Sequence, residues 1–262
     1  MVKEFLKMVR STFFAAFFIC VSYCSQGAEF IIGVEDIAYS PYYNFSSQDP
    51  SFSKDLLDKF AQDSGHKITY LPLPINQFSK WLFEENIDFK FPDNRRWKEA
   101  WDTRSLNIYY SDDILRLIAG TVILRKNQHR AQDFFKNIGI ITGFLPTQWV
   151  EQIKQGEVNI IEDSSPKVLV NQLLHNIVDG LDIDLAVANY HLKELKLQEE
   201  LVISQNTSRQ VFSYQLSSLK YPLIIEQFNS WLAQNQSFTQ KLKQQYNIYK
   251  VELDLDDINN VR

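Results

Sequence analysis

The segment 91–101, FPDNRRWKEAW, carries residues well suited to binding a small charged molecule. It places two arginines, Arg95 and Arg96, beside Trp97, directly after a predicted strand. A guanidinium group offers a planar fork of donors to a carboxylate, and an indole ring can cover an apolar or ring-shaped part of a ligand. We therefore expect an anion-binding site here. The alternative is a helix start with solvated arginines and a half-buried tryptophan, because such pairs also occur on ordinary surfaces.

A second candidate site is a cluster of tyrosines. Tyr39, Tyr42 and Tyr43 lie in the loop after the first predicted strand, residues 30–34. Open α/β sheets bind ligands at the carboxyl ends of their strands, so Tyr39 and Tyr42 are predicted to line a site, with Tyr42 as a stacking wall. Packing within the loop is the alternative, because aromatic side chains fill cores as readily as they line pockets.

Two polar residues in the second half of the chain are further candidates. Thr142 and Gly143 follow an apolar strand and precede Pro146, so they are placed to offer a hydroxyl and backbone donors to a ligand oxygen. An ordinary strand-to-helix turn fits the same residues. Asn189 is predicted either to contact the ligand or to cap a helix over residues 190–197.

Patterns typical of metal sites and catalytic machinery are missing from the sequence. The four histidines are dispersed, and no histidine or cysteine stands beside any of them at metal-binding spacing. There is no glycine-rich phosphate loop and no G-x-S-x-G motif. The many acidic residues are interpreted as a solvated face. We therefore predict no catalytic residue, no metal and no cofactor.

The N-terminus has the order of charges typical of an export signal. Residues 1–10 contain two lysines and one arginine, and residues 12–21 contain no charge. We predict a signal peptide over residues 1–28, cleaved near Gly27 or Ala28. A membrane anchor is the weaker interpretation, because a spanning helix needs about 20 apolar residues and this stretch ends in polar ones. Both cysteines lie in the predicted signal, which would leave the mature chain without disulfides.

The composition of the mature chain favours a two-lobed protein with no nucleic-acid partner. The signal holds three of the 27 basic and one of the 32 acidic residues, leaving 24 against 31 and a net charge of −7. Such a negative charge disfavours nucleic-acid binding. The length that remains is enough for two lobes, each with its own core.

The order of predicted elements is that of two successive α/β units. Apolar runs and amphipathic stretches alternate in the first unit as strands 30–34, 68–71 and 87–91 with helices 55–61 and 76–85. Ser51 or Ser53 is predicted to start the first of these helices, and Gly65 to stop it as a C-cap. A long apolar run, 114–124, is predicted to link the lobes. The second unit contains strands 138–141, 159–162 and 183–187 with helices 148–155 and 166–179, the latter capped by Gly180. Strands 201–203 and 210–214 and two helices beginning at Pro222 and Ser237 then return to the first lobe.

In this order the chain resembles the family 3 extracellular solute-binding proteins, which serve polar amino-acid transporters. The similar pieces are Tyr39-Ser-Pro-Tyr42, Phe52-Ser-Lys-Asp55-Leu56, Asn86-Ile-Asp88 before Arg95, Tyr109-Tyr-Ser111, Gly180-Leu-Asp-Ile-Asp184, and Phe238 to Tyr246. The resemblance implies the type II periplasmic binding protein fold: two α/β lobes, each a mostly parallel sheet flanked by helices, joined by two crossover segments. Lobe 1 is expected over 29–124 and 205–262, and lobe 2 over 125–204.

The resemblance also implies a function and a set of contacts. The family holds the carboxylate of an amino acid with an arginine, here Arg95 or Arg96, and with a threonine, here Thr142. Only six residues separate Asp88 from Arg95, and Asn189 stands where the family has an acid for the ligand's ammonium. We expect a monomeric periplasmic protein that binds a small polar or amino-acid-like ligand and serves a permease or sensor in the inner membrane. The alternatives are a dehydratase-like enzyme and an accessory protein that has lost its ligand.

Overall fold

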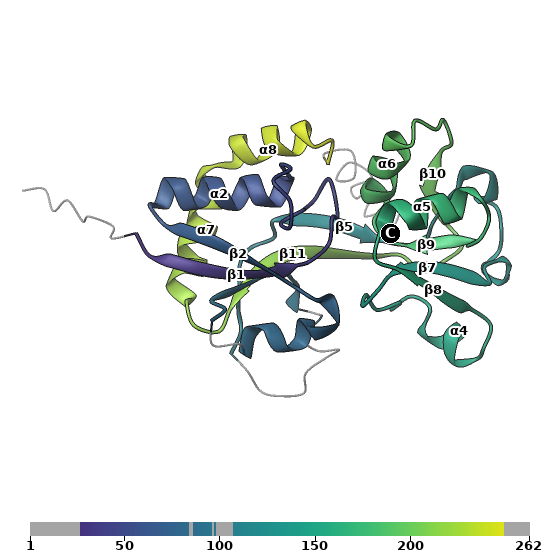
Figure 1. Ribbon diagram of the computed structural model, residues 1–262, viewed down its shortest axis with the longest axis horizontal. Helices are drawn as coiled ribbons and strands as arrows, with labels where there is room; N and C mark the ends of the chain where they lie inside the picture. Colours follow the sequence, from purple (N-terminus) through teal and green to yellow (C-terminus); the bar gives the residue numbers. More distant parts are fainter. Residues whose placement is uncertain (1–26, 84–85, 96, 98–106, 249–262) are drawn as a thin grey trace, which may run out of the picture.

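A computed structural model describes residues 27–83, 86–95, 97 and 107–248 of the chain, so the predicted signal peptide and Arg96 lie outside the described residues. The described part forms two lobes, each built on its own β-sheet (Figure 1). The predicted two-lobed α/β architecture is confirmed. No helix in these residues is both long and apolar enough to cross a membrane.

The first lobe is a mixed sheet with strand order β2-β1-β3-β11-β4. Its strands are β1 (Glu29–Glu35), β2 (Lys67–Leu73), β3 (Phe89–Asp93), β4 (Tyr109–Tyr110) and β11 (Gln210–Ser218). β1 lies parallel to both β2 and β3, while β11 runs antiparallel to β3 and β4. Helices α2 (Phe52–Ser64), α7 (Pro222–Gln234) and α8 (Gln236–Gln245) complete this lobe, and the two last helices return to it as predicted (Figure 1).

Helix α2 shows how the sequence determines a local element of this lobe. Its apolar residues Leu56, Leu57 and Phe60 are fully buried, as their helical spacing predicts. The helix ends at Gly65, which adopts a left-handed conformation with φ 70°. That conformation favours glycine because a Cβ would crowd the backbone. The predicted C-cap is therefore confirmed, and the helix begins directly after Ser51, one of its two predicted starts.

The second lobe is a five-stranded sheet with order β10-β6-β9-β7-β8. Its strands are β6 (Val122–Leu124), β7 (Asn137–Ile141), β8 (Asn159–Asp163), β9 (Gly180–Asp182) and β10 (Leu201–Ile203). β7 lies parallel to β8 and β9, so the predicted βαβαβ unit is present. The helices are α4 (Val150–Lys154), α5 (Pro166–Leu174) and α6 (Leu185–Glu194), with short 3-10 turns η3 (Arg125–Asn127) and η4 (Gln132–Phe134) before β7.

Three predicted elements differ from the structure. The helix expected over 76–85 is a 3-10 segment, η2 (Ile75–Phe83). The helix expected over 166–179 ends at Leu174, and Gly180 begins β9 rather than capping a helix. The strand expected over 183–187 is wrong, because Asp184 caps helix α6 and turns the chain out of the sheet.

The linking run 114–124 is divided between the lobes. β5 (Leu115–Ala119) pairs antiparallel with the first half of β11, and together they form the two crossover segments. β6 then belongs to the second sheet, so the first part of lobe 1 ends near Gly120 rather than at 124. A Cβ on Gly120 would stand 2.4 Å from Cγ2 of Ile203, and this close approach of β10 explains the glycine at the break.

Gly180 provides a test of the packing in the second lobe. An added Cβ would lie 2.5 Å from Cγ2 of Thr121, a fully buried side chain directly before the neighbouring strand β6. We expect Gly180→Ala to lower the free energy of unfolding by about 1–3 kcal/mol, since overpacking forces shifts in a dense core. Adding Thr121→Ser removes that methyl group and should recover most of the loss in a double-mutant cycle measured by urea denaturation. If Gly180→Ala is equally stable with and without Thr121→Ser, the clash with Thr121 is not the cause of the loss.

Candidate ligand-binding site

A cavity of about 510 Å³ lies between the two lobes. Lobe 1 contributes residues from the carboxyl ends of β1 and β3 and from the loop after β1, namely Glu35, Tyr39, Tyr43, Asn94 and Trp97. The crossover strands contribute Ile118, Ala119, Gln210, Phe212 and Tyr214. Lobe 2 contributes the turns after β7 and β9, including Phe144, Thr147, Gln148, Asp182 and Asp184. A molecule in this cavity would touch both lobes and both crossovers.

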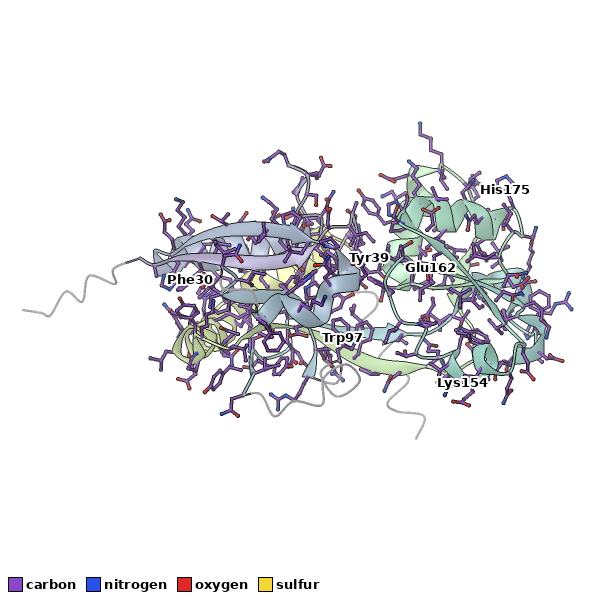
Figure 2. The ribbon with its side chains drawn as sticks, turned by 60° about the horizontal axis from the view of Figure 1, so that its bottom comes forward. Phe30, Tyr39, Trp97, Lys154, Glu162 and His175 are labelled. Carbon is purple, nitrogen blue, oxygen red and sulfur yellow. The ribbon has the colours of Figure 1, made fainter. Side chains whose placement is uncertain are left out.

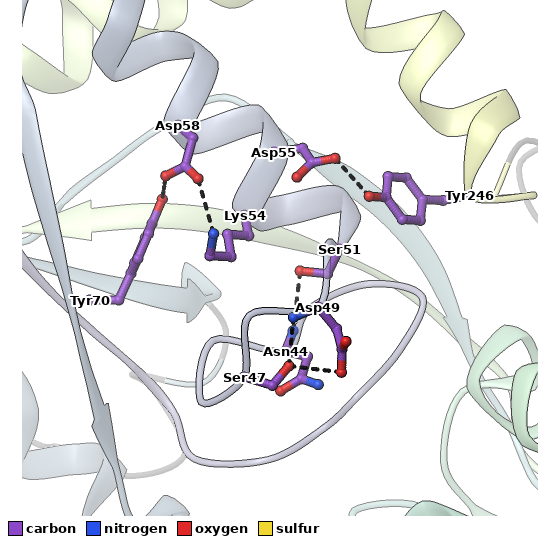
Figure 3. Close-up of polar contacts among 9 residues, drawn as sticks. All are labelled: Asn44, Ser47, Asp49, Ser51, Lys54, Asp55, Asp58, Tyr70 and Tyr246. Carbon is purple, nitrogen blue, oxygen red and sulfur yellow. Dashed lines mark hydrogen bonds and ion pairs between the residues drawn. The ribbon is translucent and has the colours of Figure 1, made fainter.

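The loop after β1 carries the tyrosines and is folded back on itself. The backbone N–H of Tyr39 donates to the carbonyl of Tyr43 at 2.9 Å. Ser53, near the start of α2, donates its N–H to the carbonyl of Tyr42 at 2.9 Å, and the hydroxyl of Ser51 accepts from the N–H of Asn44 at 3.2 Å (Figure 3). The loop is thereby tied to helix α2, which fixes where its aromatic rings point.

Aromatic rings form much of the cavity wall. Trp97 stands 6.2 Å from Phe212, which stands 5.5 Å from Tyr214, measured between ring centroids. On the other side the ring of Tyr39 meets Phe144 of lobe 2 edge-on at 5.6 Å. Tyr39 lies where the two lobes meet (Figure 2). Such a wall suits an apolar, ring-shaped or cationic ligand group.

Two carboxyl groups of the wall have strongly raised pKa values. Glu35, only 3% exposed, accepts a hydrogen bond from the hydroxyl of Tyr43, but burial raises its pKa to about 7. Asp182 accepts from the side-chain amide of Gln148 at 3.3 Å, and burial raises its pKa to about 7 as well. Its second oxygen, Oδ2, is buried and has no hydrogen-bond partner. Both groups thus exchange protons near neutral pH.

Asp184 connects the lobes. Its carboxyl accepts from the hydroxyl of Tyr42 in lobe 1 at 2.6 Å and from the N–H of Ala186 at 2.8 Å, which caps helix α6. Its own N–H donates to the hydroxyl oxygen of Tyr39 at 2.9 Å. Burial raises the pKa of Asp184 to about 6, although these hydrogen bonds lower it. Two tyrosines of one lobe therefore hold a single residue of the other.

A buried ion pair acts on the lining residue Glu35. The ammonium of Lys90 is 3.4 Å from Asp93, and both residues are at most 5% exposed. The hydroxyl of Ser217 also donates to Asp93, at 2.6 Å. Burial lowers the pKa of Lys90, while the charges of Asp93 and Glu35 raise it. The lysine is thus close enough to act on Glu35 as well as on its partner.

Of the predicted site residues, the structure brings Tyr39 and Trp97 to the cavity. Tyr42 does not line it: its side chain is fully buried and bonded to Asp184, so it is a contact between lobes rather than a stacking wall. Arg95 is exposed, and its guanidinium lies 5.4 Å from the ring centroid of Tyr110, away from the cavity. Arg96 lies outside the described residues.

The two polar candidates of lobe 2 also stand outside the cavity. Thr142 is exposed, and only its neighbours Gly143 and Phe144 line the cavity. Gly143 has φ 91°, so this segment is the sharp turn that the alternative interpretation expected. Asn189 is an exposed residue in the middle of α6, and it cannot cap a helix there because Asp184 already does so.

The carboxyl groups of the wall were not predicted from the sequence, because its many acidic residues were interpreted as a solvated face. Glu35 and Asp182 are the last residues of parallel strands β1 and β9, and Asp93 and Asp163 end β3 and β8 in the same way. An acidic residue at the end of four parallel strands is the signal that could have located them. In the described part of the chain, no three acidic, histidine or cysteine residues are grouped closely enough to hold a metal ion.

The fold is similar to that of several solved proteins. No protein-family model and no curated protein matches the sequence. An ancestral arginine-binding protein bound to arginine superposes with a TM-score of 0.65 at 17% identity, covering 83% of this chain and 97% of that one. A periplasmic binding protein of an arginine transport system from Legionella pneumophila gives 0.62 at 14% identity, over 84% and 100%. The ancestral amino-acid-binding precursor of cyclohexadienyl dehydratase gives 0.63 at 16%, over 83% and 95%. The fold of this chain is therefore the two-lobed periplasmic binding protein fold.

The Tyr42–Asp184 hydrogen bond can be tested by deleting one hydroxyl. We expect Tyr42→Phe to destabilise the contact between lobes by about 1–3 kcal/mol, because a buried carboxyl loses a donor. Small-angle X-ray scattering should then show a more open molecule. Tyr70→Phe is the matched control, since Tyr70 donates to Asp58 at the same 2.6 Å but within lobe 1 (Figure 3). Unchanged scattering of Tyr42→Phe would contradict the role of this bond.

The raised pKa values predict how stability depends on pH. Glu35, Asp182 and Asp184 have folded pKa values of about 7, 7 and 6, all above their ordinary values. Between about pH 4 and 7 the folded protein therefore binds more protons than the unfolded chain, and the free energy of unfolding falls as pH rises. Burial lowers the pKa of His191, which makes the free energy of unfolding rise with pH instead. The contribution of one carboxyl group is therefore measured as the difference in stability between the wild type and a variant that lacks it.

We expect Asp182→Asn to be less sensitive to pH than the wild type over this interval. Each titrating group changes the slope by at most about 1.4 kcal/mol per pH unit. Denaturation of both proteins in the absence of ligand, at pH 5, 6 and 7.5, measures the difference. Parallel stability curves would show that Asp182 titrates normally.

Proposed function

We propose that this protein is a periplasmic solute-binding protein, which captures a small polar or amino-acid-like ligand between its lobes and delivers it to a membrane transporter or sensor. The observation that carries the proposal is the cavity itself, because its wall is built from both lobes and both crossover strands. A ligand that contacts both lobes favours the closed arrangement, and a membrane partner can recognise that arrangement.

Two further observations support this function. The solved proteins with the same fold include a periplasmic protein of a transport system and a protein bound to an amino acid. The N-terminal residues carry the charge order of an export signal, which fits a periplasmic location. The cavity volume of about 510 Å³ also lies in the range of small-molecule sites, about 300–1,000 Å³.

An enzyme on the same scaffold is the second candidate. One observation favours it: Glu35 and Asp182 line the cavity with pKa values of about 7, which is where a general acid or base works best. A precursor of a dehydratase also shares the fold. Conversion of a bound compound, followed by mass spectrometry, would favour the enzyme. Recovery of the compound unchanged favours the binding protein.

The proposal is tested by a thermal-shift screen of the mature protein with amino acids, amines, organic acids, peptides and sugars. A ligand of the site should raise the melting temperature in a saturable way, because it binds only the folded state. It should also make the molecule more compact in X-ray scattering. If no compound of this library both stabilises and compacts the protein, the proposed function is wrong.

Trp97 provides a mutational test with any ligand that the screen finds. We expect Trp97→Ala to weaken binding about 10- to 100-fold in calorimetry, as is common when an aromatic anchor is removed. Tyr190→Ala is the control, since Tyr190 lies on the surface of α6 and is 40% exposed. Equal affinities of the two variants would place the ligand elsewhere.

A further inference from the structure

The described part of the cavity wall carries an excess of negative charge. Three carboxyl groups line it, those of Glu35, Asp182 and Asp184. Among the described lining residues there is no lysine or arginine. Lys90 pairs with Asp93 and also acts on Glu35, so one ammonium serves two carboxyl groups. Four carboxyl groups against one ammonium leave a net charge of −3 when all are ionised, which a cation would offset.

Two buried acceptors on the lobe 2 side of the cavity need a donor. The side-chain amide of Gln148 donates to Oδ1 of Asp182, which fixes the orientation of the amide. Oε1 of Gln148 and Oδ2 of Asp182 are then left without any hydrogen-bond partner, although both are buried. Buried polar atoms are nearly always paired in stable proteins. A ligand with several N–H groups would supply the donors that these atoms lack.

The aromatic wall suits the same kind of ligand. Tyr39, Trp97, Phe144, Phe212 and Tyr214 all line the cavity and present rings on more than one side of it. A cation over such a face is attracted by the electrons of the ring, and the attraction grows when water is excluded.

A metal ion is a poor candidate for this cation. In the described residues the acidic side chains are not grouped closely enough to coordinate a metal together. The carboxyl groups are spread over both lobes, so an elongated molecule with one or two ammonium, guanidinium or imidazolium groups can reach more than one of them. A carboxylate on that molecule would be buried among Glu35, Asp182 and Asp184, where like charges repel.

We infer that the site takes a small organic amine that is protonated at neutral pH and carries no carboxylate. This inference rests on the proposed solute-binding function and specifies its ligand class. The amine would lie between Glu35 of lobe 1 and Asp182 of lobe 2, with aromatic rings around its carbon chain. Binding would thereby connect the two sheets through the ligand's own charge.

The test compares amines with the amino acids from which they differ by a single carboxylate. The pairs are agmatine and arginine, cadaverine and lysine, and histamine and histidine, each titrated calorimetrically into the mature protein. We expect at least one amine to bind saturably and about 100-fold more tightly than its amino acid, since placing like charges together costs several kcal/mol.

Substitutions then assign the contacts. Glu35→Gln and Asp182→Asn each keep the shape of the side chain and remove its charge, so each should weaken the amine about 10- to 100-fold. Glu162→Gln is the control, because Glu162 is an exposed residue of β8 that does not line the cavity. Thermal melting of every variant checks that it is folded.

Each outcome of these experiments decides the inference. Amino acids that bind as tightly as the amines would overturn it and leave the solute-binding function intact. Amine binding that is unchanged in both Glu35→Gln and Asp182→Asn would also overturn it, because the charge would lie elsewhere. If none of the six compounds binds, the amine class is wrong, and the broader library decides separately whether the protein binds a solute at all.

Discussion

The carboxyl group of Asp184 is the point on which the arrangement of the two lobes depends. It starts helix α6 by accepting from Ala186, and it accepts from Tyr42 across the lobe boundary. Burying a carboxyl is costly unless hydrogen bonds replace those it made with water, so Asp184 needs both of these donors. Because Asp182 lies two residues earlier, the same interaction also sets where the wall of the cavity stands. The largest cluster of buried apolar residues accordingly runs through both lobes.

Much of the fold follows from local patterns. Strands β1, β2, β7 and β8 lie close to where apolar runs predicted them, and Gly65 ends α2 where a left-handed cap was expected. The failures have a tertiary cause. The run at 183–187 is mostly apolar, as a strand can be, but Asp184 caps helix α6 and is bonded to tyrosines more than 140 positions away in sequence. No short window contains that information.

The site was harder to predict than the fold for a related reason. Tyr39 and Trp97 were found because aromatic residues after strand ends are informative in themselves. Arg95 and Thr142 were chosen by chemical type, but the structure leaves both side chains exposed. Glu35 and Asp182 were overlooked because a carboxylate in an acidic chain normally faces water. Their burial comes from the meeting of the carboxyl ends of β1 and β9, inner strands of the two different sheets, which only the topology reveals.

The same burial links stability to ligand capture. Burying the carboxyl groups of the cavity wall costs free energy, and this burial raises the pKa values of Glu35 and Asp182. A ligand that supplies positive charge and N–H donors removes the cost and stabilises the contact between lobes. Its binding energy then appears as closure, because the groups it satisfies belong to different lobes. The burial of these carboxyl groups is thus the physical origin of a response to ligand.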